Sequence, residues 1–420
     1  MAGAGSAGTG KIRVKFLVDN EKKKVVFAES GKEFVDVLLS FLTLPLGTIV
    51  RSLGKESSLG CFDELYKSVE SLDESHFQTK ACRNMLLRPL SAAGKVCEDL
   101  VVRIDDTDHR NAWNLVFLLR DMGIEDVTML EEKTLELSLE EMKTLLKKML
   151  KSDQPLTDLI FSPSDESTRT NTSLSVDVNA SFKNDSSSDS ISHKVKLLMT
   201  KTDQSAVHAE VSEEFCNIVF NFLILPLGHV VKLLGGSSSI SCIDNLHKSV
   251  EKNMSGYFKS DECRDMVLSP ELPPFFSCSN HLLMTEELLP VEGSVPCCSS
   301  CIRNRSNFGL SEMKCSHGNT KIHAVNPKVP TSTTETGGSY ANGPGKFLVT
   351  NELGVAPFSL INAFVELKKK EQSVSNLVTT EFTFTQVEVL NQLRAALVSR
   401  EALTLACSPT KPKRRPHHCH

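Results

Sequence analysis

The amino-acid sequence predicts an α+β fold that occurs twice along the chain. An offset of 181 aligns residues 14–89 with residues 195–270 without a gap, and 25 of the 56 positions from Phe34 to Pro89 are identical. Each copy starts with alternating apolar and polar residues, which favour strands, and continues with apolar residues at helical spacing. Self-similarity of this length indicates the tandem duplication of one structural unit.

A β-hairpin is predicted at the start of each copy. In the first copy Val14, Phe16 and Val18 alternate with polar residues, which is the pattern of a half-buried strand. Residues 19–23 are a polar turn, and residues 25–28 return as the second strand. The second copy repeats this arrangement.

Two helices are predicted after the hairpin. Ser30 and Glu33 have the spacing of a capping box at the start of an apolar helix that runs to Leu44. Pro45 ends this helix, because proline lacks a backbone N–H and disfavours helical geometry in the preceding residue. The second helix is amphipathic, and its buried face is predicted from the i, i+3, i+4, i+7 spacing of Phe62, Leu65, Tyr66 and Val69.

The end of each copy is predicted to form a strand, helix, strand, helix segment. An offset of 247 brings apolar strand residues and a capping box of the two copies into correspondence. These residues are Leu135, Leu137, Ser138 and Glu141 in the first copy and Phe382, Phe384, Thr385 and Glu388 in the second. The predicted fold is therefore a tandem repeat of a β-hairpin plus helices followed by a β-α-β-α segment.

The composition along the chain predicts its domain organisation. A segment rich in Ser, Asn, Asp and Thr buries too little apolar surface to offset its ordering entropy, so residues 162–191 are predicted to be a disordered linker. Residues 324–345 are expected to be a disordered loop for a similar reason. The predicted segments are a flexible leader (1–10), a first repeat domain (11–161), the linker, a second repeat domain (192–407) with a cysteine-rich insertion (271–345), and a basic and histidine-containing tail (408–420).

The insertion has the spacing of a zinc site. A Cys-x-x-Cys turn lets two thiolates converge on one ion, and a second pair of ligands completes a tetrahedron. The insertion has few apolar residues, and structural zinc contributes on the order of 10–16 kcal/mol to small folds, so zinc would order it. Unligated cysteines in a loop and a catalytic zinc are the alternatives. The predicted ligands are Cys298, Cys301, Cys315 and His317, with Cys278 and Cys297 in reserve.

The shared motifs resemble one catalogued family. They are FLTLPLGTIVRSLG, LGCFDELYKSVESLD and CRNMLLRP in the first copy, and FLILPLGHVVKLLG and CIDNLHKSVE in the second. They look like the plant family called domain of unknown function 674. The resemblance implies a plant protein, often with a repeated unit, and no established activity, substrate or catalytic residue. Family members tend to have a Cys-x-Cys-Gly knuckle where this chain has His317 at the last cysteine.

Charge and apolar patterning restrict the partners. The net charge of −5 gives no reason to expect nucleic acid or an anionic membrane as partner. Residues 34–50 are the most apolar stretch, but Asp36, Pro45 and Gly47 interrupt it, so a buried helix is favoured over a membrane span. Without a secretory signal the thirteen cysteines do not indicate a disulfide framework. An intracellular, cytoplasmic protein is predicted, with the nucleus as an alternative because of the basic tail.

The copies repeat no catalytic pattern. The leading hypothesis is a non-enzymatic interaction protein made of two modules on a flexible linker, with an unknown protein partner, structural zinc in the second copy, and no catalytic or cofactor-binding residues. One alternative is an enzyme whose site forms between the repeats. Another is a weak zinc-assisted nucleic-acid binder, for which the basic residues near the knuckle are Arg303, Arg305, Lys314 and Lys321.

Overall fold

The protein is described from a computed structural model that covers both copies. The described residues are 11–93, 130–162, 191–254, 257–258, 260–278, 282–283, 285–288, 293–296, 319–322, 326–329, 338–342, 345–371 and 373–407. The predicted leader, nearly all of the predicted linker and the predicted tail lie outside these ranges. The first half below means residues 11–162 and the second half residues 191–407.

The two halves begin with the same order of elements, two antiparallel strands followed by helices. The first half contains β1 (Ile12–Asp19), β2 (Lys24–Ser30), α1 (Lys32–Leu42), α2 (Leu46–Ser52), α3 (Phe62–Ser71), η1 (Glu74–His76), α4 (Lys80–Leu87), β3 (Leu130–Leu137), α7 (Leu139–Lys151) and α8 (Pro155–Phe161). The second half opens with β4 (His193–Thr200), β5 (Ala206–Val211), α9 (Glu213–Ile224), α10 (Leu227–Leu233), α11 (Ser241–Asn253) and α12 (Asp261–Leu268).

The remainder of the second half adds further strands and helices. These are β6 (Gly293–Pro296), β7 (Asn319–Ile322), β8 (Phe347–Thr350), β9 (Val355–Pro357), α13 (Leu360–Lys369), η3 (Val374–Asn376), β10 (Leu377–Phe384), α14 (Gln386–Val398) and α15 (Ala402–Cys407). The predicted α+β class is therefore confirmed. The end of the second half differs in detail from the predicted strand, helix, strand, helix order, because β9 pairs with β8 as a short hairpin before α13.

Each half builds its own antiparallel sheet around its hairpin. The described strands of the first half are ordered β2-β1-β3. Those of the second form a sheet of order β10-β4-β5-β8-β9 and a separate two-stranded sheet, β6-β7. Both hairpins contain a register shift at the equivalent place, between Leu17 and Val18 and between Leu198 and Met199. The equivalent irregularity shows that the two hairpins share local geometry as well as pattern.

Of the three capping boxes predicted from the sequence, two are present in the structure and one is not. The predicted capping boxes Ser138 with Glu141 and Thr385 with Glu388 are both present. The predicted box of Ser30 with Glu33 is wrong, because Ser30 ends β2 and Gly31 is the N-cap of α1. The second copy has a serine at the Gly31 position, Ser212, and its side chain accepts a hydrogen bond from the backbone N–H of Phe215.

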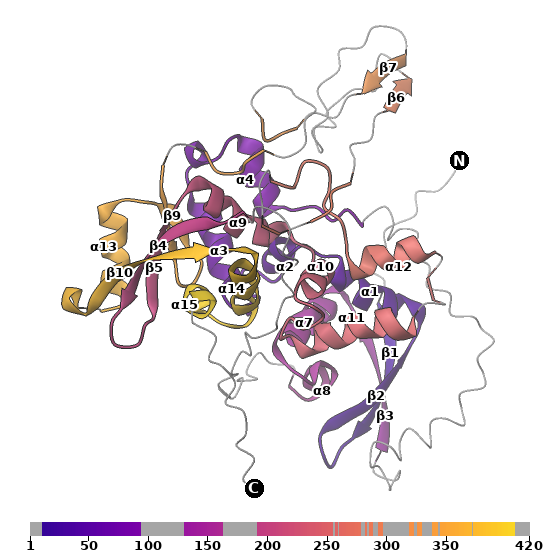
Figure 1. Cartoon of the computed structure of the whole chain (residues 1–420). Helices are drawn as coiled ribbons and strands as arrows, with labels where there is room; N and C mark the ends of the chain where they lie inside the picture. The colour runs from indigo at the N-terminus through magenta and orange to yellow at the C-terminus, as the bar shows by residue number, and fades with distance from the viewer. Residues whose placement is uncertain are drawn as a thin grey trace, which may run out of the picture.

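The two halves exchange their central helices. Helices α2, α3 and α4 of the first half contact α9 of the second, and α10, α11 and α12 of the second half contact α1 of the first. Figure 1 shows the purple helices α3 and α4 among α9, α14 and α15, and the salmon helices α11 and α12 beside α1. Each lobe is therefore built from the sheet and flanking helices of one half together with three helices of the other.

The two Leu-Pro-Leu-Gly sequences lie against each other where the chain crosses between the lobes. Pro45 and Pro226 form an antiparallel bridge. The backbone N–H of Leu46 donates to the carbonyl of Leu225 at 2.9 Å, and that of Leu227 donates to the carbonyl of Leu44 at 3.0 Å. The motif that most clearly marks the repeat is thus the crossing point of the exchange.

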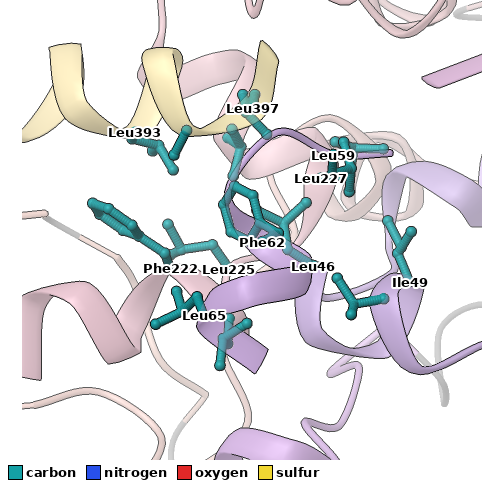
Figure 2. Close-up of a cluster of buried hydrophobic side chains, with 14 of the residues drawn as sticks. Leu46, Ile49, Leu59, Phe62, Leu65, Phe222, Leu225, Leu227, Leu393 and Leu397 are labelled. Carbon is teal, nitrogen blue, oxygen red and sulfur yellow. The ribbon is translucent and has the colours of Figure 1, made fainter. Parts of the chain in front are cut away.

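Equivalent hydrogen bonds close the two lobes. The thiol of Cys61 donates to the carbonyl of Ser399 at 3.1 Å, and the thiol of Cys242 donates to the carbonyl of Ser152 at 3.0 Å. Both bonds join one half to the other, and the offsets of 181 and 247 relate their partners. Figure 2 shows the apolar side of this junction, where Phe62 of α3 lies in one cluster with Phe222 of α9 and Leu393 of α14.

The two predicted repeat domains are therefore packed against each other. The buried apolar side chains of both halves form one connected core. Since α2 to α4 bury their apolar faces against the other half, neither half encloses its own core. The repeat boundaries at 11–161 and 192–407 remain predictions.

Parts of the insertion also belong to the core. Phe275, Phe276 and Tyr340 are buried, and Tyr340 donates its hydroxyl to the carbonyl of Phe276 at 2.7 Å. The backbone of Gln78 in the first half donates to the carbonyl of Tyr340 at 2.9 Å. The predicted disordered loop at 324–345 is therefore wrong for residues 326–329 and 338–342, which are anchored in the lobe.

Candidate functional site

The predicted zinc ligands Cys298, Cys301, Cys315 and His317 lie outside the described residues, as does the reserve ligand Cys297. The described chain ends on either side of them are held together, because β6 pairs with β7 and the last pair in the register is Pro296 with Asn319. Within the described ranges, no three His, Cys, Asp or Glu side chains are grouped so that they could hold a metal.

The other reserve ligand, Cys278, lies in the core. Its thiol donates to the side-chain oxygen of Asn221 at 3.4 Å, and burial raises the pKa of the thiol to about 11. In the described structure this thiol is part of the packed core, with Asn221 as its hydrogen-bond partner. The described geometry therefore gives Cys278 a structural role.

A buried lysine near Cys278 was not predicted from the sequence. Lys328 is 1% exposed, donates to the carbonyl of Ser277, and lies with its Nζ 4.9 Å from the ring centre of Tyr340. Burial lowers the pKa of its amine. Only the tertiary fold brings Lys328 to this position, because the insertion around it is polar in sequence.

Most of the charged positions that both copies retain have structural roles. Asp63 accepts hydrogen bonds from Ser57, and Asp244 accepts the equivalent bonds from Ser238. Arg83 and Arg264 donate to the carbonyls of Glu70 and Glu251, near the ends of α3 and α11. These side chains fix the loops around the exchanged helices, which explains why they recur without forming a catalytic pattern.

A cleft of about 630 Å³ lies between the halves. Its walls are α3 of the first half and α13 of the second, and the β8–β9 hairpin is its floor. Gly354 of the hairpin faces Glu64, since a Cβ added to Gly354 would lie 3.4 Å from the carboxylate of Glu64. The lining includes Glu64, Lys67, Ser71, Leu348, Glu352, Val355, Val365, Glu366, Lys369 and Lys370.

The charges around the cleft are partly paired. Lys369 forms an ion pair with Glu366 at 2.6 Å, and this hydrogen bond raises the pKa of the lysine. Glu352 lies 3.8 Å from both Lys370 and Arg400. Lys67 also lines the cleft, and it makes no ion pair within the described part of the chain.

Helix α13 exposes an apolar face next to this cleft. None of its residues is buried, and Leu360 is 82%, Ile361 76% and Phe364 65% exposed. Of the eight large apolar side chains exposed in the described ranges, five lie between residues 360 and 374. An apolar surface concentrated in this way is typical of an interaction site.

Comparison with known proteins identifies the family. The family described as "Protein of unknown function (DUF674)" matches residues 8–114 and 109–387. The chain belongs to this family. The two DUF674 matches include both Leu-Pro-Leu-Gly sequences and the elements around the cleft, and they are consistent with two copies of the domain.

The other comparisons add no relative to the DUF674 assignment. Neither the curated proteins nor the solved structures contain a match to this chain. None of the helices in the described ranges is long and apolar enough to cross a membrane. The site must therefore be interpreted from its own geometry.

Proposed function

We propose that this protein is a non-enzymatic interaction protein that binds a protein partner on α13 and the adjoining cleft. The observation that supports the proposal is the exposed apolar face of α13, formed by Leu360, Ile361, Phe364 and Val365. Exposing this surface is unfavourable unless a partner covers it, by about 25 cal/mol for each Å² of apolar area. The proposal places the protein inside a plant cell, in the cytoplasm or the nucleus.

An amphipathic helix of the partner is the proposed occupant. Residues of the two helices α3 and α13 line the cleft, and Leu348, Val355 and Val365 contribute apolar surface to it. Lys67 also lines the cleft and has no ion-pair partner among the described residues. Charge complementarity therefore favours a helix with an apolar face flanked by carboxylates, in the helix-in-groove mode of recognition.

Substitution of the exposed face tests this proposal. Purification of the full chain from plant extract is expected to retain a set of proteins that the double variant Leu360→Ser, Phe364→Ser loses. Leu139→Ser is the matched control, since Leu139 is an equally exposed leucine (70%) on the first half. Equal retention by all three chains would contradict the proposal. A small molecule that co-purifies stoichiometrically, without proteins, would favour the enzyme alternative.

One observation favours the alternative that the protein is an enzyme. The cleft lies between the halves, where an enzyme assembled from both repeats would have its site. The paired charges of Lys369 and Glu366 argue against acid–base chemistry there, because the hydrogen bond stabilises the charged lysine and thereby hinders proton release.

We also propose a structural zinc ion held by Cys298, Cys301, Cys315 and His317. The support is their spacing and the β6–β7 pair, which joins the two ends of the segment that contains them. The purified chain is expected to contain one zinc per molecule, and Cys298→Ser, Cys301→Ser to contain none while both lobes still unfold cooperatively. A wild-type chain without zinc, or a double variant that retains it, would overturn this proposal.

A further inference from the structure

We infer that this protein can assemble with a second copy of itself by the same helix exchange that joins its own halves. In such a dimer the first half of each chain would interlock with the second half of the other. The inference concerns a different surface from α13 and does not depend on the proposed function. It rests on the reciprocal contacts between the halves.

The contacts that interlock the halves do not require the halves to belong to one chain. The crossing bonds join Leu46 to Leu225 and Leu227 to Leu44, and the lobe-closing bonds join Cys61 to Ser399 and Cys242 to Ser152. Each bond has one partner in residues 11–162 and the other in residues 191–407. A pair of chains can form all of them between molecules, in the manner of a domain swap.

The linker determines whether the halves pair within one chain or between two chains. Residues 163–190 connect the halves. Joining two modules in one chain raises the effective concentration of one module at the other, to the millimolar range for short flexible connections. The intramolecular pairing therefore dominates in dilute solution. A linker too short to span the halves removes this advantage, and the intermolecular pairing is then the only one that preserves the contacts.

Exchange of helices between two folded monomers is expected to be slow, because it has a kinetic barrier. The helices that cross are buried in the core of the opposite lobe, as Leu46, Phe62 and Leu227 show. Two folded monomers must open both lobes before they can exchange. Association through an exposed surface needs no such opening.

Two tagged versions of the full chain test the inference. They are unfolded together in guanidinium chloride, refolded at high concentration and purified through one tag; the same is done with chains lacking residues 167–186. The second tag is expected to be retained in a fraction of the full-length protein and in most of the shortened protein, as dimers that persist on dilution. Folded chains mixed without denaturant are the control and are expected not to co-purify.

Two results would overturn the inference. The first is that both linker lengths refold to native circular dichroism and remain monomeric. The second is that folded chains co-purify after simple mixing, since this would show association through an exposed surface.

Discussion

Gly47 and Gly228 occupy equivalent places in the two copies, and other backbone segments approach both of them closely. A Cβ on Gly228 would lie 2.6 Å from the carbonyl oxygen of Val267 and 3.1 Å from that of Leu42. A Cβ on Gly47 would lie 3.0 Å from the carbonyl oxygen of Leu223. Leu42 and Leu223 belong to helices of the opposite copy, whereas Val267 belongs to the same copy as Gly228. The glycines of the shared motif are therefore explained by close backbone packing both between the copies and within each copy.

Alanine at these positions is expected to destabilise the fold unequally. Gly228→Ala should lower the free energy of unfolding by about 1–3 kcal/mol, because backbone atoms must move to accept the methyl group. Gly47→Ala should cost less, because its nearest contact is longer. Urea unfolding measures both. Gly345→Ala is the control, since no atom lies within 4 Å of its added carbon, and a change as large as that of Gly228→Ala would contradict the account.

His229 is a second residue whose surroundings make a prediction. Its Nδ1 lies 3.1 Å from the hydroxyl of Ser269, and its Nε2 is buried with no hydrogen-bond partner among the residues that the structure describes. Burial lowers the pKa of His229 to about 4, and the charge of Lys232 contributes. The first copy has Thr48 at this position, and its hydroxyl donates to the carbonyl of Pro89 at 2.9 Å.

The low pKa of His229 predicts acid sensitivity. Above pH 6.5 the imidazole is neutral in the folded and the unfolded chain, so its titration does not change the free energy of unfolding. Between pH 6.5 and about 4 only the unfolded chain takes up the proton, so stability falls as the pH falls, by at most about 1.4 kcal/mol per pH unit. His229→Thr should lose less stability than wild type between pH 7 and pH 5 in urea titrations. An equal loss would show that the imidazole does not contribute.

At the scale of elements, α9 combines two tasks. Its apolar residues contact α2, α3 and α4 of the first half, and two asparagines hold the insertion. The side-chain oxygen of Asn217 accepts hydrogen bonds from the backbone N–H groups of Tyr340 and Ala341, both at 2.9 Å. Polar residues inside this apolar helix therefore serve docking of the insertion.

Removal of the Asn217 oxygen should release this part of the insertion. Asn217→Leu leaves two buried N–H groups without an acceptor, and each costs about 1–3 kcal/mol. Faster hydrogen exchange at the amides of Tyr340 and Ala341 is expected, while the amides of β1 keep their protection. Unchanged exchange at both amides would refute the docking role of Asn217.

The sequence predicts these elements better than it predicts their partners. The spacing of Phe62, Leu65, Tyr66 and Val69 correctly assigns the buried face of α3. It cannot assign the surface that covers this face, because α1 and α9 come from duplicated sequence and offer similar apolar surfaces. Pairing within or between the copies satisfies the pattern equally, and only the three-dimensional structure distinguishes them.

The candidate site could not be predicted from the sequence, for a related reason. The cleft joins α3 to β8, β9 and α13, which are nearly 300 residues apart in the chain. Its lysines and glutamates resemble ordinary surface residues until the exchange places them together. The zinc ligands, by contrast, were predicted from local spacing alone, and they remain a prediction.

At the scale of the whole molecule, the duplication produced one interlocked body. The reciprocal bonds of Cys61 and Cys242 follow an approximate twofold relation between the halves, as expected of a dimer whose subunits became joined in one chain. Each lobe depends on helices from the other half. A destabilising substitution in α3 is therefore expected to weaken the second sheet more than the first.

Cleavage of the linker in the folded protein tests this exchange most directly. A protease site is placed within residues 163–190, the full chain is cut after folding, and the products are analysed by size-exclusion chromatography with light scattering. Ser399→Cys is added and the chain is refolded in a glutathione redox buffer, so that a disulfide reports which cysteine lies beside position 399. The account predicts that the two fragments stay together in native buffer and that a disulfide from Cys61 to position 399 joins them on a non-reducing gel. Two separately folded fragments, or a disulfide from Cys242 to position 399 within one fragment, would contradict it.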